Sequence, residues 1–170
     1  MNIRQLTIIS LLIALEIILT RFLSIQTLIV RISFGFVAIF IVAYLYGPLW
    51  GGTMAAISDV LGMMIFPKGH YFPGFTLTAF ITGYLFGVFF HQKFLNILYL
   101  FFSMIFINII IILLNTCWLS FLIGKSFIFI LPIKIIQLIF MLPVQLIIII
   151  FILKNTYFNK IFLTIKKLPS

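Results

Sequence analysis

Residues 107–114 read INIIIILL and residues 146–153 read LIIIIFIL, so both runs are apolar at nearly every position. A transmembrane β-strand would alternate polar and apolar side chains, because successive residues face the barrel lumen and the lipid in turn. A helix needs no such alternation, since all its backbone hydrogen bonds lie within the segment. These runs therefore predict transmembrane helices and argue against a barrel.

The rest of the chain has the same membrane-protein composition. Of 170 residues, 65% are hydrophobic, 18% aromatic and only 8% charged, whereas soluble domains carry about 25% charged residues. At roughly 20 residues per span, residues 1–170 accommodate about six helices in one all-α integral membrane domain. The expected spans are residues 5–22, 27–46, 49–66, 74–90, 94–123 and 130–153. The apolar run of the second span begins only near Phe34, which makes that span short.

The basic residues indicate the orientation in the membrane. If both termini are cytoplasmic, Arg4, Lys93, Lys154, Lys160, Lys166 and Lys167 lie inside, and Arg21, Arg31, Lys68, Lys125 and Lys134 lie on or near the outer side. The basic tail after Leu153 is the clearest positive-inside signal. An even number of spans then places the N-terminus on the cytoplasmic side as well.

The five outer cations form a candidate rim, joined by His70 and Tyr71 in the loop FPKGHYFPG at residues 66–74. A rim of cations and aromatic rings suits the capture of a small, planar anion. The same residue types also serve as interfacial anchors with snorkelling side chains. Composition alone leaves both interpretations open.

Polar side chains inside the spans are the other candidates, because polar groups are costly at membrane depth. Asn108, Asn115 and Trp118 fall within an arc of about 80° on one helix face. They could bind the edge of a heterocycle, or the amides could join two helices. Lys134 and Gln137 share a face at i, i+3, where Lys134 could reach a ligand carboxylate or snorkel outward.

The chain contains only two acidic residues, Glu16 and Asp59. Asp59 follows the small-residue run GGTMAAIS at residues 51–58, so we expect it to pair with an arginine or with backbone donors where helices pack closely. Glu16 is expected at a contact between helices. Ser10 and Ala14, spaced four apart on the first helix, could form a docking groove for another membrane protein.

The sequence lacks the motifs that several classes of function require. The sequence has no Walker A loop. Its two histidines, His70 and His91, are distant and isolated, so no metal site is expected, and no Ser/His/Asp set can be assembled. Cys117 is the single cysteine, and no basic face is available for nucleic acid. We therefore expect neither enzymatic activity nor a cofactor.

A set of local motifs resembles the folate-specific S component, the substrate-binding subunit, of energy-coupling factor (ECF) vitamin transporters. The motifs are FGF at 34–36, YGPLWGG at 46–52, SDVLG at 58–62, FPKGHYFPGFTLTA at 66–79, LNTCW at 114–118, GKSF at 124–127 and LP at 131–132. The resemblance covers nearly the whole chain. The FPGFT loop and the NTxW segment are its most specific parts.

This resemblance implies a six-helix bundle in a prokaryotic plasma membrane that binds folate near the outer face. The partners it implies are an ECF transmembrane coupling protein and two cytoplasmic ATPase subunits, which would supply the ATP hydrolysis. In that family a small-xxx-small pattern on the first helix contacts the coupling protein, and Ser10 and Ala14 stand at the matching place.

The resemblance also implies which ligand the outer rim and the polar faces of the helices would bind. The pterin would stack between aromatic rings and bond to Asn108 or Asn115, while the carboxylates would seek Arg31, Lys68 and Lys134. The full candidate site is Arg31, Lys68, Tyr71, Phe72, Phe75, Asn108, Asn115, Trp118, Lys134 and Gln137. Members of the family more often carry Arg and Lys at the positions of Lys134 and Gln137. The alternatives are an S component for pantothenate or a thiamine precursor, and a small lipid-acting membrane enzyme.

Overall fold

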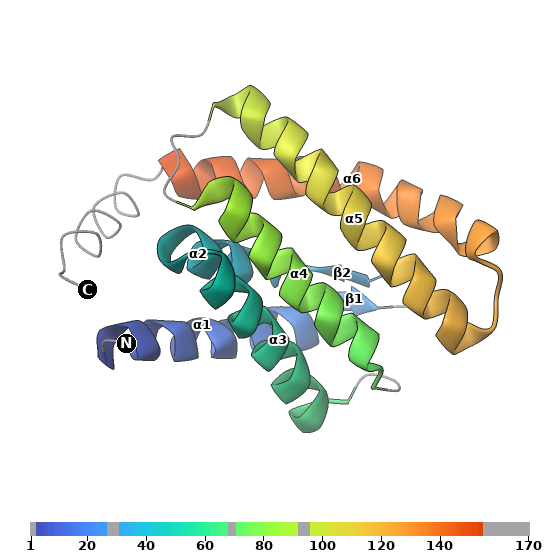
Figure 1. Cartoon of the computed structure of the whole chain (residues 1–170), viewed down its shortest axis with the longest axis horizontal. Coiled ribbons are helices and arrows are strands. Elements are labelled where there is room, and N and C mark those ends of the chain that lie inside the picture. The colour runs from blue at the N-terminus through green and yellow to red at the C-terminus, as the bar shows by residue number, and fades with distance from the viewer. Residues whose placement is uncertain (1–2, 27–30, 68–70, 92–95, 155–170) are drawn as a thin grey trace.

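The computed structural model describes residues 3–26, 31–67, 71–91 and 96–154. Within these ranges the chain forms six helices and a two-stranded hairpin (Figure 1). The helices are α1 (Ile3–Arg21), α2 (Phe36–Tyr46), α3 (Pro48–Ile65), α4 (Pro73–Phe90), α5 (Ile97–Ile123) and α6 (Phe127–Lys154), and the strands are β1 (Ser24–Gln26) and β2 (Arg31–Ser33). In Figure 1, α1 and α6 lie on opposite sides of the bundle, and α4 packs between α3 and α5.

The outer surface of the bundle is suited to lipid. Four of the described helices, α1, α4, α5 and α6, are long and apolar enough to cross a membrane, while α2 has only 11 residues. Large side chains such as Phe121 and Phe140 are 75% and 71% exposed. Water would make so large an apolar surface an interaction or aggregation site, whereas hydrocarbon solvates it. The predicted helical membrane fold is confirmed.

The second predicted span, 27–46, is wrong in its first part. Helix α2 begins only at Phe36, and residues 31–33 form β2, which pairs antiparallel with β1 so that Ser24 lies opposite Ser33. The segment TLIVRIS at 27–33 is rich in β-branched residues, and a short apolar run of this kind suits a strand as well as a helix. Residues 27–30, and the expected start of the fifth span at residue 94, lie outside the described residues. The other predicted ends agree with the helices to within three residues.

Glycines set how closely α3 and α4 approach. A Cβ added to Gly83 would overlap the backbone of Gly51, and one added to Gly51 would lie 2.7 Å from the carbonyl oxygen of Gly83. The next glycine on α4, Gly87, lies against the backbone of Pro48 in the same way. The two helices therefore touch backbone to backbone, as small residues at four-residue spacing allow.

The long helices contribute side chains both to an apolar core and to a cavity beside it. Phe40 packs its ring against Phe86 and Phe90, with centroids 5.9 and 5.6 Å apart, and Met104 of α5 and Ile149 of α6 are fully buried in the same cluster. Beyond this core, the same helices turn polar residues toward a shared cavity. The core thus fills the half of the bundle that holds the C-terminal end of α4 and leaves the other half open for a ligand.

Candidate binding cavity

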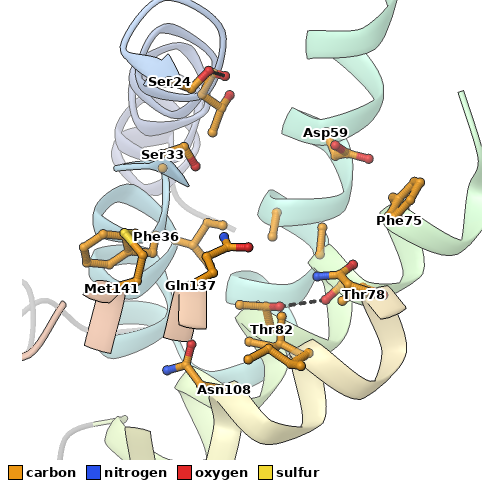
Figure 2. A pocket seen from close by; sticks show the side chains of 18 of the residues that line it. Ser24, Ser33, Phe36, Asp59, Phe75, Thr78, Thr82, Asn108, Gln137 and Met141 are labelled. Carbon is orange, nitrogen blue, oxygen red and sulfur yellow. Dashed lines mark hydrogen bonds between the residues drawn. The ribbon is translucent and has the colours of Figure 1, made fainter. Parts of the chain in front are cut away.

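The cavity has a volume of about 810 Å³ and is lined by all six helices and by the hairpin. Cavities of this size hold drug-sized ligands. Its floor, the end next to the apolar core, is formed by Ile39, Thr82, Phe86, Asn108 and Gln145. Its mouth, at the opposite helix ends, is formed by Ser24, Tyr71, Leu122 and Ile123. Figure 2 shows Asn108 and Thr82 at one end and Ser24 at the other.

An amide pair occupies the floor. Asn108 Nδ2 donates to Gln145 Oε1 and to the carbonyl oxygen of Met104, each at 2.9 Å. These two bonds use both N–H groups of Asn108, so the groups that can face a ligand are the Asn108 carbonyl and the Gln145 NH2. One acceptor and two donors side by side match a heterocycle edge that carries both kinds of group. Asn108 thus joins α5 to α6, which is one of the two roles that the sequence left open, and it also lines the cavity.

Aromatic rings form the wall between the mouth and the floor. Phe72, Phe75 and Tyr71, three of the predicted binding residues, all line the cavity. The rings of Phe72 and Phe75 are 6.0 Å apart in an edge-to-face arrangement. They come from the residues that lead into α4 and from its first turn, because α4 begins at Pro73. This wall suits a flat, partly apolar ligand.

Asn115 and Trp118 take different places on α5. Asn115 lines the cavity about two helical turns from Asn108. Trp118 is not a lining residue: its ring lies 5.7 Å from that of Phe72, and its indole N–H donates to Thr78 Oγ1 at 3.1 Å. A Cβ on Gly74 would come within 2.6 Å of this indole. Trp118 thus supports the aromatic wall from behind.

A polar chain links three helices beside the mouth. Arg21 Nη2 lies 3.9 Å from Asp59 Oδ1 and 3.5 Å from the Asp59 carbonyl oxygen, and Thr76 Oγ1 donates to Asp59 Oδ2 at 2.9 Å. The Thr76 hydroxyl is also 3.3 Å from that of Tyr71. The expected pairing of Asp59 with an arginine is confirmed. Because the Arg21 side chain is only 2% exposed, removing its partner would leave a buried charge, which is strongly destabilising.

The formal charges of the described residues that line the cavity sum to zero. Glu16 and Asp59 carry negative charge, and Arg21 and Lys134 carry positive charge. Lys134 Nζ is 3.4 Å from Gln137 Oε1, and both side chains line the cavity from α6, as their i, i+3 spacing predicts. An excess of positive charge for an anionic ligand must therefore come from residues beyond these four.

Comparison with known proteins identifies the family. Residues 4–153 match the family described as "ECF transporter, substrate-specific component". The chain belongs to this family. A folate transporter FolT of Clostridium novyi (strain NT) is 50% identical to this S component over 115 residues, which cover 67% of each protein. A folate transporter FolT of Leuconostoc mesenteroides is 40% identical over 92 residues, or 53% of this chain and 49% of that relative.

A solved structure shares the fold. The crystal structure of FolT bound with folic acid matches this S component with a TM-score of 0.80 at 31% identity. The match covers 86% of this chain and 89% of that one. The chain therefore has the overall fold of that solved structure.

The remaining predicted residues are Arg31, Lys68, Ser10 and Ala14. Lys68 lies outside the described residues, and for Arg31 the structure describes only the backbone, in β2. Ser10 and Ala14 are exposed on α1, whereas Leu12 and Glu16 of the same helix are buried. The small-residue pattern of α1 thus lies on the exposed face of this helix. Among the described residues, no three His, Cys, Asp or Glu side chains gather as a metal site requires.

Sequence reasoning missed several lining residues, above all Gln145, Glu16 and Arg21. Gln145 continues the face of α6 that holds Gln137 and Met141 at four-residue steps, so periodicity could have revealed it. Arg21 was assigned to the outer rim, but it is buried in an ion pair. Glu16 was expected at a contact between helices; it packs against Gly35 before α2 and also faces the cavity.

Proposed function

We propose that this S component is the folate-binding subunit of an ECF-type importer, capturing folate at the outer face of the cell membrane. The observation that carries the proposal is the cavity itself, with its amide floor and aromatic wall, in a fold shared with a FolT bound to folic acid. Two similar proteins are folate transporters, which supports the same substrate. The volume of about 810 Å³ accommodates a ligand of folate's size.

In this proposal the pterin enters first and lies over the floor. Its ring atoms that donate and accept hydrogen bonds meet the Asn108 carbonyl and the Gln145 NH2, with Asn115 placed for a further contact on the same side. The aminobenzoyl ring then lies against the wall formed by Phe72 and Phe75, where edge-to-face contacts favour an aromatic ring. Trp118 acts from behind by fixing Phe72.

The glutamate of the ligand lies nearest the mouth. Lys134 lines the cavity from α6 and is the carboxylate partner that we propose among the described cations, with Gln137 beside it. Arg31 and Lys68 are the further carboxylate partners we propose, since the four described charges of the cavity cancel. Tyr71 stands at the mouth and closes the aromatic wall. Charge-assisted hydrogen bonds of this kind are stronger than neutral ones.

The proposed role requires no chemistry on the substrate. ATP hydrolysis would come from two cytoplasmic ATPase subunits, joined to this chain by a transmembrane coupling protein. Ser10 and Ala14, on the exposed face of α1, would be the contact with that protein. Both termini would be cytoplasmic, which places the cavity mouth on the outer side.

The direct test is mass spectrometry of small molecules released from the detergent-purified protein. We expect a pterin-containing vitamin. Recovery of pantothenate or a thiamine precursor would overturn the substrate while keeping the family. Isothermal titration with Lys134→Ala should then show weaker binding of folic acid but unchanged binding of a pterin that lacks the glutamate.

A further inference from the structure

The floor of the cavity contains a third polar side chain that does not belong to the amide pair. Thr82 of α4 lines the cavity at the same end as Asn108 (Figure 2). Its hydroxyl donates to the carbonyl oxygen of Thr78 at 2.7 Å. Within the described part of the chain, Thr82 makes no second side-chain hydrogen bond. A hydroxyl has one hydrogen and two lone pairs, so Thr82 Oγ1 is left as an acceptor at the floor.

The three polar side chains of the floor come from three helices that pack in a defined order. Helix α5 packs against both α4 and α6; it carries Asn108, whereas Thr82 is on α4 and Gln145 is on α6. Asn108 Nδ2 donates to Gln145 Oε1 and to the Met104 carbonyl oxygen, which leaves the Asn108 carbonyl as an acceptor and the Gln145 NH2 as a donor. From α6 to α4, the floor therefore offers a donor, an acceptor and a second acceptor.

This order has one complement among the edges of a pterin. The edge that carries O4, N3–H and the 2-amino group presents an acceptor, a donor and a second donor. O4 and N3–H pair with the Gln145 NH2 and the Asn108 carbonyl, as two amides pair with each other. The 2-amino group is next to N3–H and then lies on the α4 side, where Thr82 Oγ1 is the acceptor.

We infer that Thr82 is a specificity residue that accepts a hydrogen bond from the 2-amino group of the pterin. This inference rests on the proposed folate-binding function and deepens it, because the recognised edge grows from two groups to three. The ligand class selected in this way is a 2-amino-4-oxo heterocycle. A 2-oxo analogue would place an acceptor against the Thr82 oxygen, and an analogue with hydrogen at this position would leave that oxygen without a donor.

The substitution Thr82→Val removes the acceptor and keeps the branched shape of the side chain. The Thr78 carbonyl remains bonded to the backbone N–H of residue 82 within α4. The Thr78 hydroxyl, which accepts from the indole of Trp118, takes no part in the bond that is lost, so the aromatic wall keeps its support. Thr53 of α3 is the matched control: its hydroxyl donates to the Leu49 carbonyl oxygen at 2.9 Å in the same way, but the side chain is exposed and does not line the cavity.

The test compares folic acid with 2-desaminofolic acid, in which hydrogen replaces the 2-amino group, by isothermal titration. The wild type should prefer folic acid by about 5- to 100-fold, the range for a buried polar group left without its partner. Thr82→Val should reduce this preference to about twofold or less. Thr82→Ser, which keeps the hydroxyl, and Thr53→Val should both keep the wild-type preference.

Aminopterin, the 4-amino analogue of folic acid, tests the other end of the same edge. Its 4-amino group faces the Gln145 NH2, so its affinity relative to folic acid should be equal in the wild type and in Thr82→Val. If Thr82→Val keeps the preference for the 2-amino group, or changes both ratios of Kd alike, Thr82 is structural and the inference is overturned. If the wild type binds no folic acid at all, the proposed function fails first, and the two failures are distinguishable.

Discussion

Two helix pairs enclose the cavity, α3 with α4 and α5 with α6, and the two pairs pack in different ways. In α3 and α4, glycines bring backbones into direct contact, with Gly83 against Gly51 and Gly87 against Pro48. In α6, which is 28 residues long, only Ile130 and Ile149 are buried. The first pair therefore has a fixed geometry that tolerates no added atoms, whereas α6 is a wall held by α5 on one side and by lipid on the other.

The largest expected effect is at the contact between glycines. Gly83→Val would drive side-chain carbons into the backbone of Gly51, so α3 and α4 would have to separate. Overpacking of a tight interface costs about 3 kcal/mol or more when backbone, not side chain, must move. We expect loss of the folded state in detergent, measured by thermal unfolding and size-exclusion chromatography. A variant with wild-type stability would show that the backbone contact is not essential.

The next effect concerns the bond that joins the two walls of the floor. Asn108 on α5 donates to Gln145 on α6, so it both shapes the binding surface and fixes α6. Asn108→Leu removes this bond and the carbonyl that faces the ligand, with an expected cost of about 1–3 kcal/mol in binding. We expect a 10- to 100-fold rise in the Kd of folic acid by isothermal titration.

A matched change tests whether that loss comes from the floor or from α5 in general. Asn115→Leu also removes an amide from a cavity-lining position on α5, but no described hydrogen bond to α6 depends on it. Its effect on the Kd should be the smaller of the two. Equal losses for both variants would mean that the floor pair has no special part in binding.

The sequence predicted the elements of the fold better than their pairing. Apolar runs and turn residues located six helices, because membrane spans must be long and apolar. The start of α2 was misplaced because TLIVRIS at 27–33 suits strand and helix alike. Arg21 and Asp59 are 38 residues apart in the chain, and nothing in a local pattern specifies that two helices place these side chains together. Face periodicity was sufficient for Lys134 and Gln137, whose spacing alone places them on one side of α6.

A smaller effect on stability is expected at Gly124, where α5 is connected to α6. Gly124 has φ of +70° and nothing within 4 Å of an added Cβ, so Gly124→Ala isolates the cost of backbone conformation from that of crowding. The left-handed region costs a residue with a Cβ about 1 kcal/mol. We expect a small decrease in unfolding temperature and an unchanged Kd. A decrease as large as that of Gly83→Val would show that the α5–α6 connection is as tightly constrained as the α3–α4 contact.

The smallest effect is expected on the lipid-facing side of α6. Phe140 is 71% exposed, whereas Phe40 of α2 is fully buried among the rings of Phe86 and Phe90. Truncating a buried phenylalanine costs about 3–5 kcal/mol, so Phe40→Ala should unfold readily in detergent. Phe140→Ala removes the same atoms from a surface that detergent or lipid covers in the folded and in the unfolded state. The lost apolar contact is therefore similar in the two states and largely cancels in the unfolding free energy. Its unfolding free energy should change by less than about 0.5 kcal/mol. A loss at Phe140 approaching that at Phe40 would mean that another protein surface, and not lipid, normally covers this side of α6.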